Sequence, residues 1–110
     1  MIADDVPILA PTGDLDLHTS RDLGSRRAEM AGAPAGDAVL DLSGLSFIDS
    51  VGLGVVLKAV NRFSRQGKRL VLVVPDEGNI ARLIDFSGAR ERVMIVSSRD
   101  EAVGLALTPR

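Results

Sequence analysis

The pattern of apolar and polar positions is most informative in residues 40–57, which read LDLSGLSFIDSVGLGVVL. A short apolar strand ends near Leu42, and the turn-forming pair Ser43-Gly44 follows it. Asp49 and Ser50 then stand directly before a segment with helical periodicity. The pattern therefore predicts a strand, a turn and a helix start within one stretch, with Ser50 as the N-cap of the helix.

The predicted helix has two distinct faces. At 100° per residue one face, which we expect to pack on a sheet, collects Leu53, Val56, Leu57, Val60 and Phe63. The opposite stripe, which we expect to face solvent, collects Val51, Val55, Lys58 and Arg62. Valines beside a serine on a solvated face indicate a docking surface. Single exposed valines are also ordinary at protein surfaces, so the valines alone leave both interpretations open.

The remaining elements alternate in type along the chain. Strands are predicted at an edge position over Val6–Pro11, at Ala38–Leu42, at Arg69–Val74 and at Val93–Val96, with a turn at Thr12–Asp16. Helices are predicted from Thr19 to Ala31, from Val51 to Gln66-Gly67, from Glu77 to Ser87, and after a capping box formed by Ser98 and Glu101. This order predicts one α/β domain with a four- or five-stranded, mainly parallel sheet and about four helices packed on it.

Length and composition narrow the classes of function. The 110 residues suit one domain, taken here as residues 1–110, and 45% apolar residues suffice for a core. There is no cysteine and no apolar run long enough to span a bilayer, so we expect a cytoplasmic protein that does not enter a membrane. A net charge of −2 and 3% aromatic residues argue against a nucleic-acid partner.

The sequence gives little support for catalysis or for metal binding. The segment around Ser50 is one glycine short of the G-x-S-x-G nucleophile elbow, and the only histidine, His18, precedes the serine. The acidic residues that could suggest a metal site are Asp14, Asp16, Asp41 and Asp49, but their spacing matches no calcium loop. No dinucleotide or P-loop motif is present. We therefore predict no enzyme activity, no catalytic residue, no cofactor and no metal.

Ser50 allows two interpretations. As a plain N-cap it would stabilise the helix by about 1 kcal/mol. As a phosphorylation site it would add roughly −1.5 to −2 charges beside Asp49, at a helix N-terminus where an anion is tolerated. In the second case the fold survives and binding to a partner is lost.

Three blocks of the sequence resemble one known family. They are Gly13-Asp14-Leu15-Asp16 with Thr19, the stretch 40–57 with its D-S-x-G-L-G motif, and RLIDFSG at 82–88 with the apolar residues 93–96 beyond it. In this order and spacing they resemble the STAS domain of bacterial anti-sigma factor antagonists, over residues 6–107.

The resemblance implies a partner-switching protein of the bacterial cytoplasm that regulates transcription. The unphosphorylated antagonist would bind an anti-sigma factor that is also a serine kinase and free the sigma factor. The kinase would phosphorylate Ser50 with its own ATP, and a separate phosphatase would reverse the step. The partner-binding surface carried over by motif consists of Asp14, Asp16, Thr19, Asp49, Ser50, Val51, Gly52, Leu53 and Val55. A monomer or weak dimer is expected.

Two features depart from the family pattern. Only five residues precede Val6, so the family's additional N-terminal strand is expected to be absent or very short, which would leave a sheet edge open to pairing with another chain. Val51 stands where many antagonists have a second serine. The alternative function is a scaffold subunit of a stressosome-like signalling assembly or of a lipid-transport complex, in which related domains serve.

Overall fold

The computed structural model describes residues 2–3, 6–15, 37–91 and 93–107. Its main sheet has five strands in the order β1-β2-β4-β6-β7. The strands are β1 (Ile2–Ala3), β2 (Val6–Leu9), β4 (Ala38–Asp41), β6 (Leu70–Val73) and β7 (Ile95–Val96). Strands β2, β4, β6 and β7 run parallel, and β1 pairs antiparallel with β2. The predicted fold class, an α/β domain with a mainly parallel sheet, is confirmed.

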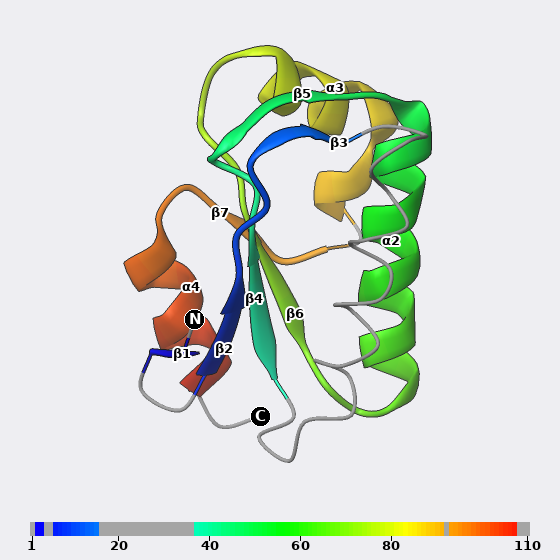
Figure 1. The fold of residues 1–110 in the computed structure, drawn as a ribbon. Coiled ribbons are helices and arrows are strands. Elements are labelled where there is room, and N and C mark those ends of the chain that lie inside the picture. Colours follow the sequence, from blue (N-terminus) through cyan, green and yellow to red (C-terminus); the bar gives the residue numbers. More distant parts are fainter. Residues whose placement is uncertain (1, 4–5, 16–36, 92, 108–110) are drawn as a thin grey trace.

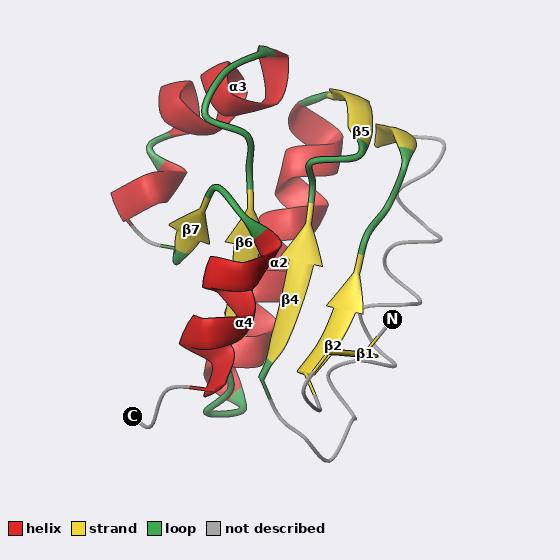
Figure 2. Cartoon of the chain, turned by 90° about the vertical axis from the view of Figure 1, so that its left-hand side faces the viewer, coloured by secondary structure: helices red, strands yellow, loops and turns green. Residues whose placement is uncertain are grey.

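Three α-helices lie among the described residues, and they cover both faces of the sheet (Figures 1 and 2). They are α2 (Ser50–Arg65), α3 (Asn79–Ser87) and α4 (Arg99–Leu107), with a 3-10 turn at Ala89–Glu91. Figure 2 shows α4 in front of the sheet and α2 behind it. The helix predicted from Thr19 to Ala31 lies outside the described residues.

The strands explain this layering, because successive side chains point to opposite faces of a sheet. Alternate residues of β4 and β6 pack with α2 and α3: Ala38, Leu40, Leu70 and Leu72. Those between them pack with α4: Val39, Val71 and Val73. Both central strands are buried along their whole length, as expected of parallel strands covered on each face.

A second, two-stranded sheet lies above the carboxyl ends of the main strands. It pairs β3 (Gly13–Leu15) with β5 (Leu45–Ile48) in parallel, and Figure 1 shows it beside α3 and the first turn of α2. The prediction of a turn over Thr12–Asp16 is therefore wrong for residues 13–15. No strand at Leu45–Ile48 was predicted, because its residues, LSFI, do not alternate strictly between apolar and polar. In the structure its two end residues are buried and its two central residues are exposed.

The edge assignment of the first predicted strand is also wrong. Ile2 pairs with Pro7 and Ala3 with Val6, so β1 lies outside β2. The N-terminal strand is present and only two residues long, as the sequence allowed.

Helix ends agree closely with the sequence. Gly67 and Gly88 follow α2 and α3 with φ of 71° and 73°, left-handed values that favour glycine. The predicted capping box at α4 is half formed. Glu101 N–H donates to Ser98 Oγ at 3.2 Å, but Glu101 Oε1 accepts from Ser98 Oγ at 3.3 Å instead of from the Ser98 backbone N–H.

Candidate functional site

Helix α2 begins one residue earlier than the sequence predicts. Asp49 is the N-cap, with an extended backbone (φ −104°, ψ −178°), and its side chain accepts a hydrogen bond from Gly52 N–H at 2.8 Å. Ser50 is the first helical residue, so its prediction as the N-cap is wrong. Aspartate and serine are both favoured N-caps, and here the aspartate has the non-helical backbone that the cap position requires. The Ser50 side chain is therefore released from capping and is exposed.

The first turn of α2 exposes apolar surface beside Ser50. Val51 is 43% exposed, in agreement with its predicted place on the solvent stripe. Gly52 and Leu53 are buried against the sheet side of the helix. Val55 is half-buried and packs against the core, so its prediction as a solvent-facing residue is wrong. Because Val55 is only half-buried, the exposed part of its side chain can still belong to the same surface as Val51.

Strand β3 brings a second predicted segment to the same end of the molecule. Asp14 is exposed and lies opposite Phe47 in the β3–β5 pairing, and β5 leads directly into the start of α2. Gly13 has a φ of 77°, and the register shifts between Gly13 and Asp14, so glycine suits this irregularity. Asp14 and Ser50 thus belong to neighbouring segments, whereas Asp16 and Thr19 lie outside the described residues.

Two apolar side chains were missed by the sequence reasoning. Phe47 on β5 is 45% exposed, and Phe86 on α3 is 92% exposed. Helix α3 packs beside β5, at the end of the molecule where α2 begins (Figure 1). Phe86 could have been found from helical periodicity, because it falls opposite the inward-facing Ile80 and Ile84.

Asp41, one of the acidic residues considered for a metal site, has a structural role. It is 4% exposed and accepts hydrogen bonds from Ser43 N–H at 2.9 Å and Ser43 Oγ at 2.6 Å. Arg99 at the start of α4 donates to its other oxygen at 2.9 Å. Burial alone raises the pKa of Asp41, but the bonds from Ser43 and the Arg99 charge outweigh it and hold this pKa below its usual range.

Within the described part of the chain, no group of three His, Cys, Asp or Glu side chains is placed to hold a metal ion. Nor is any helix there both long and apolar enough to cross a membrane.

The family follows from a direct match. The model of the STAS domain family matches residues 2–102, so the chain belongs to the STAS domain family. The fold is also that of anti-sigma factor antagonists. A Thermotoga maritima protein assigned as an anti-sigma factor antagonist superposes with a TM-score of 0.87 at 25% identity, covering 98% of this chain and 92% of that one.

Two further solved structures extend the comparison. The Bacillus cell fate determinant SpoIIAA in its phosphorylated form gives a TM-score of 0.69 at 23% identity, over 96% of this chain and 94% of that one. A sulfate transporter family protein from Wolinella succinogenes gives 0.78 at 16% identity, over 96% and 88%. At these identities both show a shared fold alone.

Proposed function

We propose that this chain is an anti-sigma factor antagonist that binds an anti-sigma factor serine kinase through the start of α2 and loses this binding when Ser50 is phosphorylated. The observation that carries the proposal is the exposed Ser50 in the first turn of α2, beside the exposed Val51. The likeness to an assigned antagonist and to a phosphorylated SpoIIAA supports the same function.

The surroundings of Ser50 favour a switch that acts on the partner and leaves the fold unchanged. A phosphate there would sit at the helix N-terminus, where backbone N–H groups and the helix dipole favour an anion. The first basic residue of α2 is Lys58, eight residues on, which is about 12 Å along the axis at ~1.5 Å per residue. No basic side chain of the first two turns would neutralise the phosphate, so its charge would add to that of Asp49 and meet the partner directly.

The proposed partner surface is apolar with an acidic border. Val51 and Phe47 supply exposed apolar area, while Asp14 and Asp49 stand beside them. Asp16, Thr19 and Val55 complete the surface proposed from the family motif. Gly52 and Leu53 belong to the same motif but are buried. The chain would act by binding, in the cytoplasm, with ATP used by the kinase and a separate phosphatase restoring Ser50.

The test compares Ser50→Asp with Ser50→Ala. Baits of the wild type and both variants would first recover the kinase from lysate, and titration calorimetry with the purified kinase would then give affinities. We expect Ser50→Ala to bind like the wild type and Ser50→Asp to bind at least tenfold more weakly, about 1.4 kcal/mol. Ser97→Asp, which adds the same charge at an exposed position before α4, serves as control. Equal affinity of all variants for the kinase would refute the switch.

A scaffold or transport-associated role is the second candidate, favoured by the likeness to the sulfate transporter family protein. The two functions differ in assembly. An antagonist is expected to be a monomer or weak dimer, whereas a scaffold would form a large complex. Size-exclusion chromatography with light scattering would distinguish them.

A further inference from the structure

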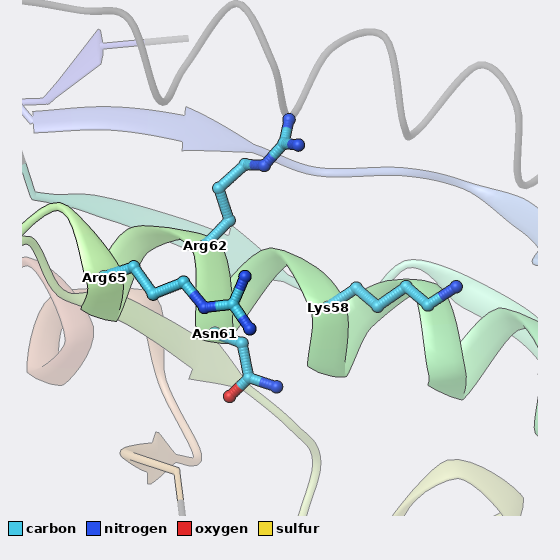
Figure 3. A pocket seen from close by; sticks show the side chains of 4 residues that line it. All are labelled: Lys58, Asn61, Arg62 and Arg65. Atoms are coloured by element: carbon cyan, nitrogen blue, oxygen red, sulfur yellow. The ribbon is translucent and has the colours of Figure 1, made fainter.

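The carboxyl-terminal half of α2 concentrates positive charge in a protein of net charge −2. Lys58, Arg62 and Arg65 follow one another at helical spacing on one side of the helix and form what we name the basic row (Figure 3). None of the ion pairs among the described residues includes any of the three. Helix α2 carries no acidic residue to offset them. Such a segregated charge favours an acidic partner.

A hollow of about 330 Å³ lies over this row and is bounded by the three cations and Asn61. In Figure 3 Arg62 and Asn61 point to opposite sides of α2, so Asn61 marks the border of the row. Arg62 and Arg65 in the last turn also complement the helix dipole, but Lys58 lies too far from the helix end for that role. The dipole therefore explains only part of the row.

A groove lined by both apolar and polar side chains begins at the same asparagine. It runs between α2 and the chain leading into β7, with a volume of about 230 Å³ and a smaller extension beside it. This α2–β7 groove has an apolar lining of Leu57, Val60, Leu70, Val93 and Met94. Its polar lining consists of Asn61, Ser64, Lys68 and Arg69. Met94 is 44% exposed, and β7 is the outermost strand in the described part of the sheet. Apolar walls and a cationic border thus meet on one surface.

From this juxtaposition we propose that the basic row and the α2–β7 groove together form a second docking surface for an extended acidic peptide segment of a partner protein. An apolar side chain of the peptide would enter the groove, and its carboxylates would face the three cations. The groove does not favour single-stranded nucleic acid as the occupant, because none of its lining residues is aromatic. The surface is on the half of α2 remote from Ser50, so the proposal does not depend on phosphorylation.

The experiment is selection from a displayed library of random twelve-residue peptides on the purified full chain. We expect selected peptides to combine aspartate or glutamate with leucine, isoleucine, methionine or phenylalanine. In ¹⁵N-labelled protein their binding should shift the amide signals of Asn61, Ser64 and Met94. The absence of enriched peptides, or shifts confined to other segments, would overturn the proposal.

Substitutions distinguish the contribution of the basic row to peptide affinity from that of the α2–β7 groove. Arg62→Glu combined with Arg65→Glu is expected to weaken binding of a selected peptide at least tenfold. Met94→Gln, which keeps the net charge, is expected to weaken it severalfold. Arg82→Glu combined with Arg90→Glu, which also reverses two charges at exposed positions, is the matched control and should bind within twofold of the wild type. Circular dichroism should first establish that each variant is folded. A peptide insensitive to the neutral substitution Met94→Gln would show that charge alone attracts it and would refute the groove.

Two further outcomes are decisive. Ser50→Asp should leave peptide affinity unchanged within twofold, and a loss would mean that the surface is not separate from the start of α2. A DNA oligonucleotide that binds the basic row more tightly than the selected peptides would replace the proposed occupant and overturn the proposal.

Discussion

Asp41 precedes β5 in the sequence and Asp49 follows it, and the two carboxylates make the same kind of local hydrogen bond. Each accepts a backbone N–H from a residue two or three positions on, Ser43 at 2.9 Å and Gly52 at 2.8 Å. Asp41 is buried and is also held by Arg99, which lies 58 residues away along the chain. Asp49 is partly exposed and only begins a helix. The difference shows that one carboxylate joins distant segments, while the other caps a local helix start and leaves the Ser50 side chain exposed.

The largest effect is expected from Asp41→Ala. The substitution leaves Arg99 and the turn at Ser43 without their acceptor, and hydrogen bonds to charged groups are each worth about 1.5–3 kcal/mol. We expect a loss of about 2–3 kcal/mol in the free energy of unfolding, measured by urea denaturation. Asp85→Ala, which removes the exposed ion pair with Arg90, is the control and should cost less than about 1 kcal/mol. Equal losses of unfolding free energy in Asp41→Ala and Asp85→Ala would mean that the burial of Asp41 does not strengthen its interactions.

A smaller effect on the free energy of unfolding is expected when the pH is lowered. The pKa of Asp41 is lower in the folded protein than in the unfolded chain, where aspartate titrates near ~3.9. Its ionised form therefore stabilises the fold above that pH, and this contribution is lost as the pH falls through the lowered pKa. The difference in unfolding free energy between wild type and Asp41→Asn should be constant from pH 7 to about 5 and shrink below about 4. A difference that persists undiminished at pH 2 would contradict the prediction.

The smallest effect is expected from Asp49→Ala. Losing the N-cap should cost about 1 kcal/mol in unfolding free energy, while Asp49→Asn keeps the cap and should cost a few tenths. Chemical denaturation of both variants tests this difference. If Asp49→Ala is as damaging as Asp41→Ala, the contrast between the two aspartates does not hold.

The main sheet and its helices could be predicted because their signals are local. The apolar runs at residues 38–41 and 70–73, the glycines after α2 and α3, and the capping box before α4 each act within a few residues. The small β3–β5 sheet could not, because each of its strands is short and pairs only with a segment far along the chain.

The site was predicted in part for the same reason. Motif and periodicity placed Ser50 at the start of α2 with Val51 exposed beside it. They could not decide which of two adjacent capping residues has an extended backbone, nor that Val55 packs partly on the core. Phe47 was missed because its exposure depends on the unpredicted strand β5.

The parallel order of the sheet also constrains how the chain reaches its native state. In the described sheet only the two-residue pairing of β1 with β2 joins strands that are close in sequence. The pairing of β4 with β6 requires closure of the whole segment that contains β5 and α2. Such non-local contacts must overcome loop-closure entropy before they stabilise anything. We therefore expect this small domain to fold on a millisecond rather than a microsecond scale, with the rate limited by the pairing of β4 with β6 and the packing of α2 on their face.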